Sequence, residues 1–223
     1  MNARKAIFER LQRVQPEPVP VPDTAAWMHR FALKEDSSQR TARLRSGLEM
    51  FKTEVHEVDA GNWADVLLAL ALAKGWRHLL IGAGTAHGEH LAALAPPALQ
   101  VLRYSQPIEG WKDQLFDGVD AALTLARGAV ADTGSLILWP SAAEPRLMSL
   151  VPSTHVVLLD AHTIHATLFD VMRAEGWAQS MPTNALLICG PSKTADIQQT
   201  LAYGAHGPRE LIVLLRQSRG DDV

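Results

Sequence analysis

The stretch WADVLLALALAKGWRHLLIGAGTAHGEHLAALAPPALQVLRY, residues 63–104, decides the fold class of this chain. Its beginning, Trp63 to Lys74, has the apolar content of a helix, and Gly75 follows at a position where glycine commonly ends one. The next apolar run, Arg77 to Gly82, is too short and too continuous for a surface helix and predicts a buried strand. The same alternation then repeats, with a helix over Ala86 to Leu94 and a strand over Leu99 to Tyr104.

Helices that alternate with short apolar strands are crossover connections between parallel strands. We therefore predict an α/β fold with a mostly parallel sheet and helices on both faces. Asn62 and Asp65 suit the start of the first helix, as an N-cap and a first-turn acid. Later segments continue the alternation: helix Ile108 to Phe116, short helix Arg146 to Leu150, strand His155 to Asp160, helix Thr163 to Glu175, strand Ala185 to Cys189, helix Thr194 to Tyr203 and strand Glu210 to Leu215.

The middle of the chain departs from this alternation of helices and strands. Two predicted strands, Asp120 to Leu125 and Gly134 to Trp139, are separated only by Ala126 to Thr133. That segment is too short for a parallel crossover that packs a helix. We expect an antiparallel pair or a bent excursion from the sheet at this place.

The amino-terminal part is predicted to form an arm. Apolar residues at helical spacing predict a helix over Arg4 to Val14, and the prolines that follow predict an extended tether. A second helical region begins at Asp23 or Thr24, loosens near Asp36 and continues to about Phe51. We thus predict three parts: an arm over residues 1–23, an α/β domain over 24–216 and a polar tail over 217–223.

Composition excludes several classes of protein. The 223 residues include 21 basic and 24 acidic side chains, and the basic ones form no stripe, so nucleic acid is not an expected partner. The absence of a long apolar run and the presence of Glu9 near the start predict a cytoplasmic protein without a membrane span. Cys189 alone supplies too few ligands for a structural zinc or an iron–sulfur cluster, and we expect no metal or cofactor bound by this chain.

The segment from Gly190 to Asp196 is the strongest candidate for a binding site. An apolar strand ends there in Gly-Pro, and the predicted helix opens with Ser192, Lys193 and Thr194. The first N–H groups of such a helix would face the carboxyl end of the sheet, where anions bind. The hydroxyl groups also suit simple helix capping, so the same residues have a purely structural interpretation.

A histidine and a turn follow this segment. Gly207 and Pro208 hold His206 in a tight loop, where an imidazole could act as an acid, a base or a hydrogen-bond donor. A structural or simply solvated histidine is the alternative.

The block GPSKTADIQQTLAYGAHGPREL, from Gly190 to Leu211, resembles the carboxyl-terminal signature of the lactate-utilisation (LUD) domain family, in particular its lactate-utilisation protein C group. Further upstream, the segments 131–136, 146–152 and 155–159 are also similar, so the likeness spans nearly the whole chain. It implies a fold shared with CoA transferases, ribose-5-phosphate isomerase and 5-formyltetrahydrofolate cyclo-ligase. It also implies a role in a bacterial system that oxidises L-lactate to pyruvate, beside two iron–sulfur proteins.

The resemblance also draws attention to Asp132, Thr133 and Gly134, where the family commonly has Glu-Thr-Gly. A glutamate in the sheet's active-site region is the nucleophile of related CoA transferases, whereas aspartate is one methylene shorter. Since a misplacement of about 1 Å can cost on the order of a hundredfold in rate, we treat Asp132 as a ligand-orienting acid. Arg146 is a candidate carboxylate clamp, with a surface role as the alternative.

Three other signals are weaker. The run IGAGTAHG, residues 81–88, follows a strand but lacks the spacing of a dinucleotide-binding fingerprint, so a glycine-permitted turn explains it better. The histidine pairs at 87 and 90 and at 162 and 165 have no evident third metal ligand. Cys189 reads as a small buried hydrophobe, although a reactive thiolate is the alternative.

Two functions follow from these residues. The first is a non-cluster subunit of an L-lactate oxidation system, whose iron–sulfur clusters reside in partner proteins and whose pocket binds a small anionic metabolite or a partner loop. The second is a stand-alone isomerase, acyl-transferase or folate-ligase-type enzyme acting on a phosphorylated or CoA-linked metabolite. In both cases Asp132 and His206 are the candidate catalytic groups, and the anion-binding candidates are Thr133, Gly134, Arg146, Gly190, Ser192, Lys193, Thr194 and Asp196.

Overall fold

The computed structural model describes residues 3–13, 19–30, 32, 34–195, 201–203 and 206–217. The chain forms two compact units, Met1–Leu33 and Lys34–Val223. The first unit contains helices α1 (Ala3–Arg13) and α2 (Thr24–His29), and the Asp23 carboxylate caps α2 by accepting a hydrogen bond from the Ala26 N–H at 2.9 Å. The predicted amino-terminal helices are confirmed.

The second unit is built on a six-stranded parallel sheet with the order β1-β12-β7-β4-β2-β3. The prediction of an α/β fold with a mostly parallel sheet is confirmed. Just before β4, the Asp120 carboxylate accepts the N–H groups of Arg77 and His78 at 2.7 and 2.9 Å, which aligns the starts of two neighbouring strands. The strands are β1 (Glu54–Val58), β2 (His78–Gly82), β3 (Gln100–Tyr104), β4 (Ala121–Leu125), β7 (Thr154–Asp160) and β12 (Glu210–Arg216).

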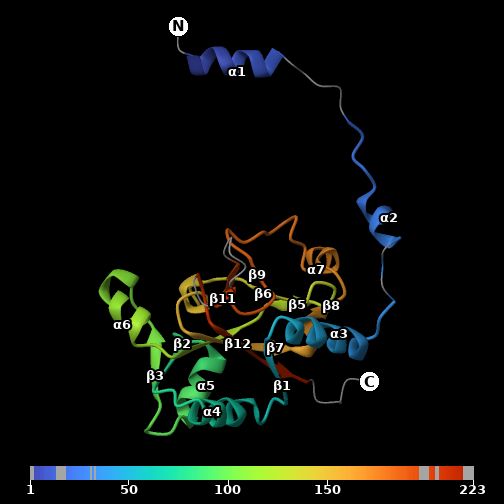
Figure 1. Ribbon diagram of the computed structural model, residues 1–223. Helices are drawn as coiled ribbons and strands as arrows, with labels where there is room; N and C mark the ends of the chain where they lie inside the picture. The colour runs from blue at the N-terminus through green and yellow to red at the C-terminus, as the bar shows by residue number, and fades with distance from the viewer. Residues whose placement is uncertain are drawn as a thin grey trace. The chain divides into compact units, whose positions relative to one another are not determined.

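One face of this sheet is covered by α4 (Trp63–Ala73) and α5 (Ala86–Leu94), which Figure 1 shows below the strands. Leu67 and Leu91 project from these helices into a cluster with alternate residues of the strands, and both are fully buried. Gly75 ends α4 as predicted, since the Trp76 N–H reaches back to the Ala71 carbonyl at 2.9 Å. Asn62 takes the predicted N-cap position of α4, but its side-chain oxygen accepts the Asp59 N–H instead of a helical one.

The other face is covered mainly by a second sheet with the order β8-β5-β6-β9. Its strands are β5 (Gly128–Val130), β6 (Ser135–Leu138), β8 (Ile164–His165) and β9 (Leu186–Ile188). The chain leaves β4, turns through β5 and returns antiparallel in β6, so the expected excursion from the main sheet is confirmed. Figure 1 shows this sheet above the six-stranded one, with α7 (Leu168–Ala174) beyond it.

Helices complete the cover of this second face. Leu44 and Leu48 of α3 (Ser37–Met50) pack with β12, β7 and the second sheet. Leu115 of α6 (Lys112–Asp117) and Met148 of the short helix η2 (Arg146–Ser149) pack over β2 and β4. Two further short 3-10 helices are η1 (Ile108–Gly110) and η3 (Ala161–Thr163). Helices therefore lie on both faces of the main sheet, as predicted.

In the part of the chain that the structure describes, one predicted helix starts later than expected, at Leu168, and another is wrong. In the helix predicted over Thr163 to Glu175, Ile164 belongs to β8, and α7 starts only after Thr167, whose hydroxyl accepts the Asp170 N–H. The helix predicted over Thr194 to Tyr203 is replaced by β10 (Lys193–Ala195) and β11 (Leu201–Tyr203), which pair antiparallel. Pairing with a neighbouring strand overrides a helical pattern in both places.

We predict that Gly134→Ala lowers the free energy of unfolding by about 1 to 3 kcal/mol. Gly134 has φ +62°, and a Cβ there would lie 3.0 Å from the backbone of Gly47 in α3. Chemical denaturation of both proteins measures the difference. Gly110→Ala is the control, because Gly110 has ordinary φ and room for a methyl group, with its nearest atom 3.6 Å away. Equal stability of Gly134→Ala and the natural protein would contradict the prediction.

Candidate functional site

The strand order places a crevice at the carboxyl ends of β2 and β4. After β2 the chain passes through α5 to β3 on one side, whereas after β4 it passes through the second sheet to β7 on the other side. Neighbouring strands whose following connections diverge form a topological switch point, where open α/β sheets bind ligands. The loop after β2, Ala83 to Thr85, belongs to the glycine-rich run that we interpreted as a simple turn.

The loop between β6 and η2, residues 139–145, lies across this edge of the sheet. It approaches the end of β2 so closely that a Cβ on Gly82 would lie 2.7 Å from the Ala143 carbonyl oxygen and 2.7 Å from Glu144 Cγ. Glu144 Oε1 lies 2.7 Å from His87 Nε2 of α5, and both carboxylate oxygens lie 3.3 Å from the N–H of Leu125 at the end of β4. The two side chains are only 11% and 16% exposed, so Glu144 is a carboxylate held inside the crevice.

Cavities flank this loop on both sides. An open cavity of about 580 Å³ lies between Ala142 and Ala143 of the loop and the segment Tyr104 to Pro107 that follows β3. A second open cavity of about 530 Å³ is bounded by Glu144 and by the ends of β4 and β7. Burial, and then the nearby Glu109, raise the pKa of Tyr104 in the first cavity above its ordinary value.

A third cavity, beneath Glu144, has a volume of only about 10 Å³. Such a volume holds about one water molecule. Arg146 lines it, and no ion pair joins this guanidinium to any residue in the described part of the chain. The cavity is lined by Thr124, Leu125, Leu138, Trp139, Pro140, Glu144, Pro145, Arg146 and Ser149.

The Thr124 side chain connects this small cavity to a buried histidine. Thr124 Oγ1 lies 2.8 Å from His155 Nε2, while His155 Nδ1 is buried without a hydrogen-bond partner among the described residues. Burial lowers the pKa of His155 to about 3, so its imidazole is neutral. We assign the proton to Nε2, because orphaned buried N–H donors are rarer than orphaned acceptors. Thr124 then accepts from His155 and keeps its own hydrogen for donation.

Other charged groups at this edge are already paired. Arg127 bonds the Glu175 carboxylate at 3.1 and 3.2 Å and lies 4.6 Å over the Trp139 ring. Asp160 accepts two hydrogen bonds from Arg216, and this pairing raises the pKa of the arginine. Arg146 is therefore the best placed of the crevice's described cations to receive an anionic ligand.

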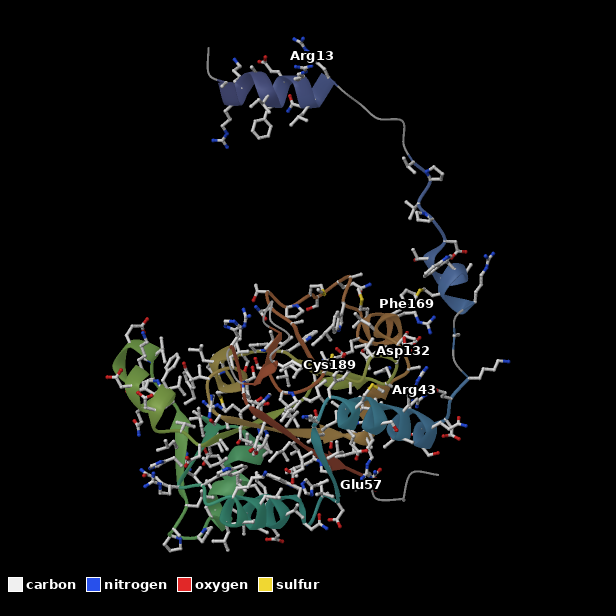
Figure 2. All side chains as sticks on the ribbon, viewed as in Figure 1. Arg13, Arg43, Glu57, Asp132, Phe169 and Cys189 are labelled. Carbon is white, nitrogen blue, oxygen red and sulfur yellow. The ribbon has the colours of Figure 1, made fainter. Side chains whose placement is uncertain are left out.

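Among the residues predicted from the sequence, Asp132, Thr133 and Gly134 form the turn between β5 and β6. Asp132 Oδ1 lies 3.3 Å from an Arg43 nitrogen of α3, and Figure 2 shows these two side chains on neighbouring segments. The Asp132 side chain is 51% exposed. An exposed pair of this kind contributes little to stability, roughly 0 to 1 kcal/mol.

Thr133 continues a short polar chain toward the only cysteine in the sequence. Thr133 Oγ1 lies 2.7 Å from Ser135 Oγ, which lies 3.0 Å from Cys189 Sγ. The structure thereby brings the Asp132 turn beside the end of β9.

The segment that follows β9 lies at the opposite edge of the main sheet from Glu144. Gly190 packs against Phe51, which precedes β1, and the Ser192 N–H donates to the Pro208 carbonyl, which precedes β12, at 2.8 Å. Lys193 Nζ lies 5.0 Å from the Phe51 ring centroid. The predicted position at the carboxyl end of the sheet is wrong, because β9 belongs to the second sheet and leads to the amino ends of β1 and β12.

The remaining predicted residues lie near the amino ends of β1 and β12 or outside the residues that the structure describes. Thr194 lies in β10 instead of at a helix start, and His206 is exposed in the loop before β12. Gly207 packs against Ser192, since a Cβ there would lie 3.1 Å from Ser192 Cβ. Asp196 lies outside the described residues. Arg146, by contrast, lines the cavity beside Glu144.

Sequence reasoning missed Glu144, Thr124 and His155, and it considered His87 only as a metal ligand paired with His90. Among the described residues, no group of three or more histidine, cysteine, aspartate or glutamate side chains could hold a metal ion. The sequence signal for Thr124 and His155 is that each is a polar residue inside a largely apolar strand.

Fold and site together define an α/β protein with a crevice at a topological switch point and a second sheet over one face of the first. Residues 41–215 match the family model of the LUD domain, and the chain belongs to the LUD domain family. The resemblance recognised in the sequence is therefore confirmed.

Several relatives extend this comparison. The chain is 36% identical over 217 residues to an uncharacterized protein of Neisseria meningitidis serogroup B, covering 96% of this chain and 93% of that protein. It is 30% identical over 118 residues to Lactate utilization protein C of Deinococcus radiodurans, covering 52% and 54% of the two chains. With Lactate utilization protein C of Macrococcus caseolyticus it shares 29% over 101 residues, covering 43% of each. The match thus spans about half the length of these lactate utilization proteins.

A solved structure supports the fold. A duf162 family protein from Deinococcus radiodurans has a TM-score of 0.60 and 21% identity, and the alignment covers 82% of this chain and 99% of that one. No helix in the described ranges of the chain combines the length and the apolar character needed to cross a membrane.

We predict that His155 makes the stability of the protein depend on pH between about 3 and 6.5. Below pH 6.5 the unfolded chain binds a proton at His155, whereas the folded chain does not until about pH 3. The free energy of unfolding therefore falls as the pH falls, by up to about 1.4 kcal/mol per pH unit from this residue.

Urea unfolding of the natural protein and of His155→Gln at pH 6.5 and pH 5 measures this contribution. Glutamine offers Thr124 a hydrogen-bonding partner but does not titrate, so the variant should lose about 1.6 kcal/mol less than the natural protein over this interval. Parallel pH profiles for the two proteins would contradict the prediction.

Proposed function

We propose that this protein is the non-cluster component of a bacterial system that oxidises L-lactate to pyruvate. The observation that carries the proposal is the LUD domain match over residues 41–215, together with relatives named Lactate utilization protein C. The single cysteine cannot hold an iron–sulfur cluster. We therefore place the clusters of the proposed system in two partner proteins and assign to this chain the binding of a small anion or of a partner loop.

Arg146 is the residue that this function would use at the carboxyl edge. Its guanidinium has no ion-pair partner among the described residues and lines the cavity beside Glu144. A guanidinium can hold a carboxylate through two parallel hydrogen bonds, which gives both orientation and affinity. Asp132 and His206 stay candidates for ligand orientation and proton transfer at the other site, near the Asp132 turn and the loop before β12.

We predict that adding this chain to the two iron–sulfur partners increases lactate-dependent dye reduction and that the three proteins co-purify. Arg146→Ala should raise the lactate concentration for half-maximal rate by about 10- to 100-fold, because a hydrogen bond to a charged group contributes about 1.5 to 3 kcal/mol. Arg77→Ala is the control, since Arg77 is exposed like Arg146 but lies at the opposite edge of the sheet.

Unchanged dye reduction with and without this chain, and no complex with the partners, would refute the proposed function. Turnover of a sugar phosphate, CoA ester or folate by the isolated chain, lost in Asp132→Ala or His206→Ala, would instead establish the stand-alone enzyme that we considered from the sequence.

A further inference from the structure

The Glu144 carboxylate occupies a position that is built for a carboxylate. Leu125 offers a backbone N–H to both oxygens at 3.3 Å, and His87 Nε2 lies 2.7 Å from Oε1. A carboxylate removed from water needs such donors to compensate for lost hydration. Arg146 lines the same cavity without an ion-pair partner among the described residues. The donors would serve the carboxylate of a small ligand equally well.

A ligand cannot share this position with Glu144. The cavity beneath the glutamate has room for about one water molecule, so a molecule the size of lactate enters only if the side chain leaves. Open cavities of about 580 and 530 Å³ lie on the two sides of the loop and provide space for the displaced side chain.

Few described hydrogen bonds hold the loop itself. A Ser141–Glu144 turn closes it, with the Ser141 N–H on the Glu144 carbonyl at 3.0 Å and the Glu144 N–H on Ser141 Oγ at 3.1 Å. The Glu144 side chain supplies the described hydrogen bonds that tie this turn to α5 through His87 and to the end of β4 through Leu125. Displacing that side chain therefore breaks the hydrogen bonds from the turn to α5 and β4 while the hydrogen bonds of the sheet stay intact.

Thr124 adds a feature that distinguishes among carboxylates. It precedes Leu125, lines the same small cavity and has a hydroxyl hydrogen to donate once His155 bonds its oxygen. A ligand whose carboxylate takes the place of Glu144 would bring an oxygen on its second carbon toward this hydroxyl.

We infer that the crevice at the carboxyl ends of β2 and β4 binds a small 2-hydroxy- or 2-oxocarboxylate, and that the Glu144 carboxylate fills the ligand's place in the free protein. The class of ligand rests on the proposed function, whereas the site rests on the geometry alone. His87, Leu125 and Arg146 hold the carboxylate, and Thr124 selects for the oxygen on the second carbon.

Calorimetric titration of the full chain with L-lactate, pyruvate, propionate and inorganic phosphate tests this inference. Glu144→Gln keeps the shape of the side chain but removes its charge, so lactate and pyruvate should bind about tenfold tighter, as expected when a competing internal group is weakened. Glu49→Gln is the matched control, because Glu49 is an exposed glutamate that pairs with Arg45 on α3. Equal dissociation constants for Glu144→Gln and the natural protein would overturn the inference.

Thr124→Val provides a second and independent measurement. Valine has nearly the shape of threonine but no hydroxyl group, so lactate and pyruvate should bind about tenfold more weakly while propionate, which has no oxygen on its second carbon, is unaffected. An equal loss for all three carboxylates, or binding of phosphate alone, would overturn the assigned ligand class. Thermal unfolding of each variant confirms that it is folded before titration.

The two proposals fail in different ways. Dye reduction that depends on this chain, without carboxylate binding at the crevice, would refute this inference and leave the proposed function intact. Binding of lactate or pyruvate that responds to Glu144→Gln, without any effect on dye reduction, would refute the proposed function and leave the site intact.

Discussion

Burial of both faces of the parallel sheet is the constraint on which the rest of the structure depends. β7 shows it most clearly, because Val156 and Leu158 face α4 and α5 while Val157 and Leu159 face the second sheet. Each fully buried aliphatic side chain contributes roughly 1.5 to 3 kcal/mol relative to an exposed one. A parallel sheet of this kind is stable only when both layers are present. The second sheet is therefore part of the core and not an appendage.

The same constraint also positions the candidate site. Since β6 lies over the second face of the main sheet, the chain must return from it to begin β7, and it does so through residues 139–153. This return passes first across the carboxyl ends of β2 and β4, where Glu144 meets His87 and the Leu125 N–H, and then along β4 through η2. Covering both faces of the sheet thus brings a carboxylate, an imidazole and an arginine together around one crevice.

Local patterns predicted most elements but not their partners. Helices α4 and α5 and strands β2, β3, β4, β7 and β12 follow apolar runs whose length and continuity reveal burial. The strand β8 and the pair β10 and β11 were misjudged as helices, because two or three residues in a strand show no period that distinguishes them from a helical turn. The candidate site was harder to predict than the elements, because its contacts join distant positions in the sequence. His87 and Glu144 are 57 residues apart, and Thr124 and His155 are 31 apart.

The sequence by itself determined the α/β class, the order of the main elements and the family of the chain, because these properties depend on local spacing and composition. Only the tertiary structure decided that Gly190 to Lys193 lies at the amino ends of β1 and β12 while Arg146 lies at the carboxyl edge with Glu144. The physical reason is that the edge on which a loop falls depends on which sheet its strand joins. That choice is made by long-range packing, which no local pattern records.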